Sequence, residues 1–217
     1  MKETTAEKIS ELIERYPALE ICRADLISAT EKICNAFRNG NKILICGNGG
    51  SAADSLHIVG ELMKGFILPR KVDDFNKNFV ERAEKLFPAD LNYFKKNLQC
   101  TLPAISLVGE TALGTAVAND NAADLIFAQQ VLGLGRRGDI LLAISTSGNS
   151  ANVLYAAKVA KVLELEIISL TGRTGGKLKN ISDVTICAPA DSAYTIQEFH
   201  LPIYHALCIA AENEFFG

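Results

Sequence analysis

The sequence has no long apolar run and little excess charge. No stretch of its 217 residues approaches the roughly 18 consecutive apolar residues that a membrane-spanning helix requires. The polar amino terminus, MKETTAEKIS, lacks the apolar segment of a secretion signal. The net charge is −3 and the isoelectric point is near 5.7, without a basic stripe that would bind nucleic acid. We therefore expect a cytoplasmic protein that binds neither membranes nor nucleic acid.

Several short motifs are also missing. The six cysteines include no CxxC pair. Five of them lie in apolar helical or strand patterns, which are typical of buried thiols in a reducing compartment: Cys22, Cys34, Cys46, Cys187 and Cys208. Cys100 lies beside a predicted loop. Neither GxGxxG nor GxxxxGK[ST] is present, so the sequence signals neither a dinucleotide nor a nucleoside triphosphate.

Short apolar runs alternate regularly with helical patterns. Five runs have the length of strands: Ile43–Cys46, Ala104–Val108, Ile140–Ile144, Glu166–Leu170 and Val184–Ala188. The helical patterns between and after them are 52–63, 122–134, 151–163, a short helix after TGRTGG, and 194–215. This alternation predicts an α/β fold, a parallel sheet with helices on both faces. The length and the 48% hydrophobic content are sufficient for a single domain over residues 1–217.

Two segments lie outside the alternation. Residues 1–40 predict an extension of two helices, the first with a capping box at Thr4 and Glu7 and the second from about Leu19 to Phe37. The charged segment 68–102 contains two short helical patterns separated by Pro88. We expect a solvated helical insertion there, with a lid or an arm between subunits as the alternatives.

Two of the strands end in turns of the same composition. KILICGNGGSAAD (42–54) and DILLAISTSGNSAN (139–152) each lead from an apolar strand through Gly, Ser, Thr and Asn into a helix. The start of a helix offers free N–H groups, and the nearby hydroxyls add further donors, which together suit a phosphate. One such turn is common in α/β proteins. Two predict an anion site at the carboxyl ends of the strands.

Three histidines carry the remaining chemical signal. His57 and Glu61 have the i,i+4 spacing that places two side chains on one helix face, although such a pair is more often a surface contact. Gln197 and His205 fall along one side of the last helix, about 12 Å apart. A metal bound by both would need a kink at Pro202 or ligands from two subunits.

The surroundings of these polar residues favour a site. His200 lies off the Gln197–His205 line and fits a core or interface histidine. The last helix is otherwise apolar, and polar side chains buried there are costly unless they have partners. Imidazole, carboxylate and amide groups together suit a divalent metal such as zinc.

The motifs together resemble a known family. GNGGSAADSLHIVGEL, STSGNSANV, LTGRTGG and IQEFHLPIYH are similar to the sugar isomerase (SIS) domain, and within it to the phosphoheptose isomerases. STSGNS alone is typical of the whole superfamily, whereas the His57/Glu61 and Gln197/His205 pairs are more specific. The resemblance extends from about Leu19 to the carboxyl terminus. It implies a flavodoxin-like three-layer α/β/α fold, and a homotetramer with active sites at subunit interfaces that act on a phosphorylated sugar.

The resemblance also implies roles for individual residues. Glu61 matches the general base of the family and His205 its general acid. The implied substrate-binding residues are Asn48, Gly49, Gly50, Ser51, Asp120, Ser145, Thr146, Ser147, Ser150 and Gln197. The zinc ligands of some members match His57, Glu61, Gln197 and His205.

These residue types suit the interconversion of a ketose and an aldose. A carboxylate can remove the proton next to the carbonyl, and a histidine can return one at the neighbouring carbon. The resemblance implies that sedoheptulose 7-phosphate is converted to D-glycero-D-manno-heptose 7-phosphate through an enediol. Gly65, where the family usually has Arg, and the long 68–102 segment leave another substrate open, such as a pentose phosphate. A non-catalytic sugar-phosphate-binding SIS regulator is a further alternative.

Overall fold

A parallel sheet forms the centre of the protein, and the computed structural model describes residues 1–217. Its five strands lie in the order β2 (Ala104–Ser106), β1 (Ile43–Cys46), β3 (Ile140–Ile144), β4 (Glu166–Thr171) and β5 (Val184–Cys187). All neighbouring pairs are parallel. Every residue of β1 and β3 is buried, because helices cover both faces, and this explains the continuous apolar runs in the sequence.

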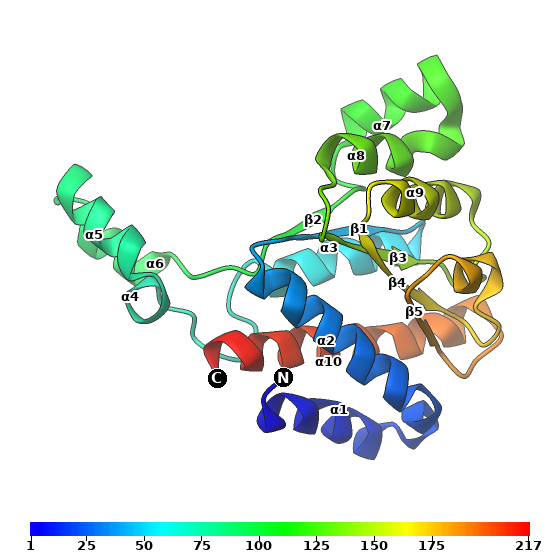
Figure 1. Cartoon of the computed structure of the whole chain (residues 1–217), viewed down its shortest axis with the longest axis horizontal. Helices are drawn as coiled ribbons and strands as arrows, with labels where there is room; N and C mark the ends of the chain where they lie inside the picture. Colours follow the sequence, from blue (N-terminus) through cyan, green and yellow to red (C-terminus); the bar gives the residue numbers. More distant parts are fainter.

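Helices pack on both faces of the sheet and give three layers (Figure 1). One face carries α2 (Arg23–Arg38), α3 (Gly50–Leu62) and α10 (Ala193–Phe216), with α1 (Glu3–Arg15) packed against α10. The other face carries α8 (Ile126–Leu134) and α9 (Ala151–Val162). Alternate residues of β1 enter the two cores, Ile45 the first and Leu44 the second. Layers and strand order are those of a flavodoxin-like fold, which confirms the predicted class.

The chain leaves β1 and β3 on opposite faces of the sheet. These strands are neighbours, yet α3 packs into the first core and α9 into the second. Such a reversal is the switch point where open α/β sheets bind ligands. Both Gly/Ser-rich turns lie here, residues 47–50 after β1 and residues 145–150 after β3.

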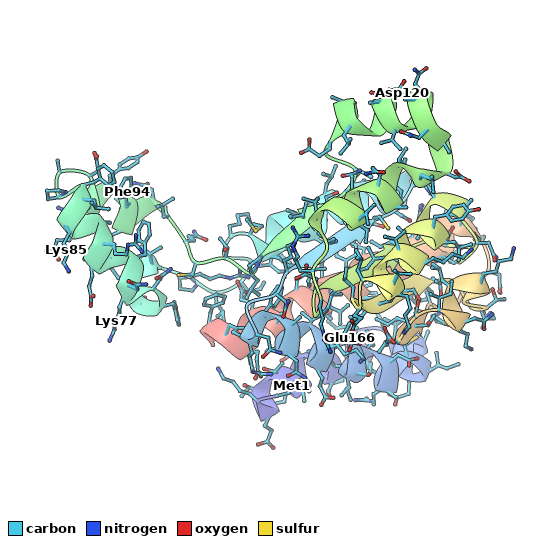
Figure 2. The ribbon with its side chains drawn as sticks, turned by 45° about the horizontal axis from the view of Figure 1, so that its top comes forward. Met1, Lys77, Lys85, Phe94, Asp120 and Glu166 are labelled. Atoms are coloured by element: carbon cyan, nitrogen blue, oxygen red, sulfur yellow. The ribbon has the colours of Figure 1, made fainter.

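The segment that connects α3 to β2 in the sequence forms a helical arm, which projects from the body (Figure 1). It contains α4 (Val72–Phe75), α5 (Lys77–Leu86) and α6 (Leu91–Asn97), and Pro88 lies between the last two as predicted. Lys77, Lys85 and Phe94 lie far from the sheet (Figure 2). The segment 68–102 is therefore helical, and it forms an extended arm.

Two predictions for the amino-terminal helices were wrong. The first helix begins at Glu3 after Lys2, without a side-chain cap, and the Thr4 hydroxyl instead accepts a hydrogen bond from Asn213 of α10. The predicted helix from Leu19 becomes α-helical at Arg23, because the residues Pro17–Cys22 form a 3₁₀ helix. Thr4 is engaged in a tertiary contact with α10 and does not cap its own helix. After Pro17 the chain first winds more tightly, as a 3₁₀ helix, before the α-helix begins.

Further differences lie between β2 and β3 and in the last helix. The short helix α7 (Thr111–Val117) was not predicted, and the helix expected from residue 122 begins at Ile126, after a π turn and a 3₁₀ turn. The last helix continues without interruption through Pro202. All six cysteines are free; Cys187, predicted to be buried, is partly exposed, as is Cys100. No helix is both long and apolar enough to span a membrane.

Candidate functional site

The first turn is built around glycines. Gly49, immediately before α3, has a φ of 54°, a backbone conformation that favours glycine. A Cβ on Gly47 would collide with the backbone of Ser51. Asn48, Gly49 and Gly50 are exposed, whereas Ser51 is buried. The free N–H groups at the start of α3 therefore open onto an accessible edge of the sheet, an arrangement suited to an anion.

The second turn presents hydroxyls on a rigid backbone. The Ser145 and Ser150 hydroxyl oxygens are 2.9 Å apart, and the Ser147 hydroxyl accepts the Asn149 N–H at 3.1 Å. Gly148 has a φ of 64° and lies so close to Gly175 that any side chain would collide with it. The Gly-rich segment after β4 thus packs directly against this turn.

A pair of amides joins the two turns. The Asn48 amide donates to the Asn152 side-chain oxygen at 2.9 Å, and the Asn152 amide donates back at 2.8 Å. Thr146 belongs to the same assembly, since its carbonyl accepts the Gly172 N–H at 2.9 Å. The structure therefore brings together the predicted residues of both turns, from Asn48 to Ser51 and from Ser145 to Ser150.

Helices α3 and α10 run side by side in the same direction. Gln197 lies against Gly50 at the start of α3. Two turns further on, the ring of His205 lies beside that of His57, and Glu212 reaches the backbone just beyond the end of α3. Because the helices are parallel, Gln197 is placed at the first turn and His205 at His57. The two predicted metal ligands of α10 are thus separated within this chain.

His57, Glu61 and His205 form one cluster. The His57 Nε2 atom is 3.0 Å from the Glu61 Oε1 atom, so the predicted i,i+4 pair is formed. The rings of His57 and His205 are perpendicular, with centroids 5.0 Å apart. The Glu61 side chain is 12% exposed and that of His57 42%, so the cluster is sheltered but accessible.

Tyr204 orients His57 from its other side, a contact that the sequence analysis missed. Its hydroxyl lies 3.0 Å from the His57 Nδ1 atom, and the residue is 2% exposed. Burial raises the pKa of Tyr204, so the hydroxyl remains a proton donor. The His57 ring is thus held between the Tyr204 hydroxyl at Nδ1 and the Glu61 carboxylate at Nε2. The one signal in the sequence is that Tyr204 directly precedes His205.

The cluster holds His205 in its neutral form. Burial lowers the pKa of His205, and the adjacent His57 lowers it further. The Nε2 atom of His205 is buried and has no hydrogen-bond partner. It is therefore available to a substrate or to a metal ion. No group of three His, Cys, Asp or Glu side chains in the chain is arranged to hold a metal ion as it stands.

Known proteins are similar to this chain in both sequence and fold. Residues 81–172 match the model of the SIS domain. The phosphoheptose isomerase of Dechloromonas aromatica is 40% identical, over 88% of this chain and 84% of that protein. That of Akkermansia muciniphila is 33% identical over 100% of both chains. The solved structure from Francisella tularensis is 31% identical, with a TM-score of 0.75 over 98% of this chain and 100% of that chain. The chain belongs to the phosphoheptose isomerase family.

The protein is therefore a sugar-phosphate isomerase, and two cavities adjoin its site. One, of about 420 Å³, lies beside the first turn and is lined by Asn48, Gly49 and residues of α7 and α8. The other, of about 360 Å³, lies between α1 and α10 and includes Arg15, Phe66 and His205. The first Gly/Ser-rich turn and His205 of the histidine cluster thus line different cavities of one chain.

Asp120 is the predicted site residue that lies furthest outside this arrangement. It is exposed on the π turn after α7 and projects at the outer edge of the molecule (Figure 2). Its carboxylate accepts a hydrogen bond of 2.7 Å from Asn119. The structure does not bring Asp120 to Glu61 within one chain.

Proposed function

We propose that this isomerase interconverts sedoheptulose 7-phosphate and D-glycero-D-manno-heptose 7-phosphate through an enediol. The observation that carries the proposal is the contact of Glu61 with His57 beside His205, on a helix that starts at the joined Gly/Ser-rich turns. A base and a proton donor are then available next to a phosphate site. The names of the relatives support a heptose phosphate as the substrate.

Glu61 and His205 divide the proton transfers. Glu61 removes the proton from the carbon next to the carbonyl and returns it at the neighbouring carbon. His205 is kept neutral by burial and by His57. The neutral imidazole donates its N–H proton to the substrate carbonyl oxygen as the enediol forms, and it recovers a proton from the neighbouring hydroxyl as that hydroxyl becomes the new carbonyl. His57, fixed by Tyr204, holds the Glu61 carboxylate in place.

The two turns hold the phosphate at the other end of the sugar. The N–H groups of Gly49 and Gly50 and the side chains of Asn48 and Ser51 belong to the first turn. The second turn contributes the hydroxyls of Ser145, Thr146, Ser147 and Ser150, and Gln197 lies over the first turn at Gly50. Binding energy from the phosphate orients the reacting carbons, which lowers the barrier without contact at the phosphate itself.

We propose zinc as the metal of this site. No three ligand side chains are arranged to hold an ion as they stand, so binding requires that these side chains turn toward the ion or that a second subunit supplies a ligand. Two imidazoles and a carboxylate, from His57, His205 and Glu61, are typical zinc ligands, and the unpartnered Nε2 of His205 is a free donor. Gln197 is the fourth predicted ligand. Zinc held there would polarise the substrate carbonyl. Elemental analysis of the purified protein tests this, since bound zinc should be present in the wild type and lost in His57→Asn.

We further propose a homotetramer whose subunits complete each other's sites. The apolar side chains of Leu56 and Met63 flank His57 and Glu61 on α3, and they are 52% and 42% exposed. The separation of the two cavities and the outlying position of Asp120 also fit a site shared between copies. Sedimentation analysis should show four chains per particle, and a monomer with full activity would contradict the proposal.

The decisive experiment is the Glu61→Gln variant. Loss of the base should lower kcat by about 10²- to 10⁴-fold, while binding of the sugar phosphate persists. Glu198→Gln, on the exposed side of α10, is the matched control and should retain activity. Full turnover in Glu61→Gln would remove the base assignment.

A panel of C5 to C7 ketose phosphates tests the substrate. We expect the highest kcat/KM for sedoheptulose 7-phosphate. Preference for a pentose phosphate would replace the heptose assignment and leave the chemistry in place.

A further inference from the structure

A buried ion pair lies directly behind the proposed catalytic helix. Arg70 and Glu212 are joined at 2.8 Å, and their side chains are 0% and 1% exposed. Arg70 belongs to the root of the arm, where its carbonyl accepts the Cys100 N–H at 2.7 Å. Glu212 belongs to α10. The pair touches no cavity of the site, and the chemistry proposed above makes no use of it.

Arg70 holds the end of α3. Its guanidinium donates to the carbonyl of Leu62 at 2.7 Å and to the carbonyl of Glu61 at 3.2 Å. Carbonyls in the last turn of a helix have no partner within the helix, and a cation there also interacts favourably with the helix dipole. The backbone of Glu61 is thus fixed from one side, while its carboxylate contacts His57 on the other.

Glu212 ties the same place to the helix that carries His205. Its carboxylate accepts the N–H groups of Phe66, Ile67 and Leu68 at distances of 2.7 to 3.0 Å. Glu212 lies about two turns beyond His205 on α10. One buried pair therefore links the end of the Glu61 helix to the His205 helix.

Stability alone does not account for such a pair. Replacing a buried ion pair by apolar side chains is often neutral or stabilising, because the cost of removing two charges from water offsets their attraction. What the pair supplies is directional geometry, since the planar guanidinium fork bonds three oxygens at fixed angles.

We propose that Arg70 is a positioning residue of the isomerisation, which sets the Glu61 carboxylate against His205 and the substrate carbon. The inference rests on the proposed role of Glu61 as the base. Arg70 contacts neither substrate nor metal, and it acts through the backbone of Glu61.

Arg70→Lys tests the geometry while preserving the charge. A lysine can pair with Glu212, but its single ammonium cannot reproduce the fork to the carboxylate and to both carbonyls. We expect kcat per folded molecule to fall by about 10- to 100-fold, because small displacements of a catalytic group have effects of this size. KM should change by less than about twofold, since the substitution does not touch the Gly/Ser-rich turns that we propose bind the phosphate.

A kinetic isotope effect separates positioning from stability. With substrate deuterated at the carbon that loses its proton, the isotope effect on kcat should increase in Arg70→Lys, because proton removal becomes slower relative to product release. Glu212→Gln keeps an acceptor for the backbone N–H groups and should show the same pattern. Should Arg70→Lys not fold, Glu212→Gln serves as the test on its own.

The matched control is another sheltered pair. Lys42 contacts the 2% exposed side chain of Asp139 at 2.5 Å, at the amino ends of β1 and β3. Lys42→Met should lower the melting temperature and leave kcat and the isotope effect of the folded enzyme unchanged. If Arg70→Lys and Glu212→Gln behave like this control, the positioning role is overturned.

The outcome distinguishes this inference from the proposed function. Full activity of Glu61→Gln removes the base assignment and the inference with it. An inactive Glu61→Gln together with wild-type kinetics for the folded Arg70→Lys enzyme removes the inference alone.

Discussion

Asn48 and Asn152 hold the two Gly/Ser-rich turns together by exchanging amide hydrogen bonds of 2.9 and 2.8 Å. Asn48 belongs to the turn after β1, and Asn152 to the first turn of α9 after β3. The strands fix the direction of each turn, but these side chains connect their tips. The spacing of the N–H and hydroxyl donors that we propose for phosphate binding therefore depends on this pair.

Asn152→Ala should weaken substrate binding. The change removes both amide bonds, each contributing about 0.5 to 1.5 kcal/mol, and so corresponds to roughly a tenfold increase in KM. kcat should change little, because Glu61 and His205 are untouched. Steady-state kinetics with the heptose phosphate and direct binding of inorganic phosphate measure the effect.

Asn41→Ala is the matched control for that variant. Asn41 donates its amide to Arg137 and Asp139 at the opposite end of the same two strands. Its loss should affect stability and not KM. Equal KM changes in both variants would show that the Asn48–Asn152 bridge has no specific part in phosphate binding.

The sequence was sufficient to predict the parts of the site that depend on local pattern. The burial of β1 and β3 appears as continuous apolar runs, and the Gly- and Ser-rich composition of the segments that follow them indicates turns at the strand ends. The i,i+4 contact of His57 with Glu61 follows from helix geometry. These features depend on residues close together in the chain.

The contacts across the chain could not be predicted. Arg70 meets Glu212, and Tyr204 meets His57, through packing of α3 beside α10, for which no local pattern exists. The parallel register of these helices also determines that Gln197 faces Gly50. Helix α7 was missed because its short sequence, TALGTAV, has no clear apolar face.

Tyr204→Phe should reduce turnover with little effect on the fold. Phenylalanine fills the same buried space but lacks the hydroxyl that contacts His57 at Nδ1. His57 then loses the partner that fixes its ring, and we expect kcat to fall about tenfold, within the range for residues that orient a ligand or catalytic group. Tyr155→Phe, on the outer helix α9, should leave kcat unchanged. Equal activity of the two variants would contradict the orienting role.

The stability of the protein should fall between pH 6.5 and pH 4 because of His200. Burial lowers the pKa of His200 to about 4, while its Nε2–H donates to the Thr171 carbonyl at 3.2 Å. Below pH 6.5 the unfolded chain binds a proton that the folded chain excludes, so the free energy of unfolding decreases. From pH 7 to pH 5 the loss from this residue is about 2 kcal/mol.

Urea unfolding of wild type and His200→Phe at both pH values measures the contribution. The variant should be less stable at pH 7, because it lacks the bond to Thr171, but its stability should change less between pH 7 and pH 5. Carboxylates with lowered pKa, such as Asp139 and Glu214, titrate alike in both proteins and cancel in the comparison. An identical pH dependence would show that His200 does not titrate as described.

Excision of the arm should leave the isomerase body folded. Lys71 and Gln99 form an antiparallel bridge at the root, so a Gly-Gly link can replace residues 72–98 without moving either end. The loss of the Phe75–Phe216 ring contact, about 0.5 to 1.5 kcal/mol, is the expected cost to the body. Arg70 remains in this variant, and the proposed geometry of Glu61 should remain with it. Thermal unfolding followed by circular dichroism should therefore remain cooperative, and binding of the sugar phosphate should resemble that of the full chain. A larger excision that also removes Arg70 should unfold the protein, since it leaves the buried Glu212 carboxylate without its cation. If the smaller excision also unfolds the protein, the arm supports the body through more than its root.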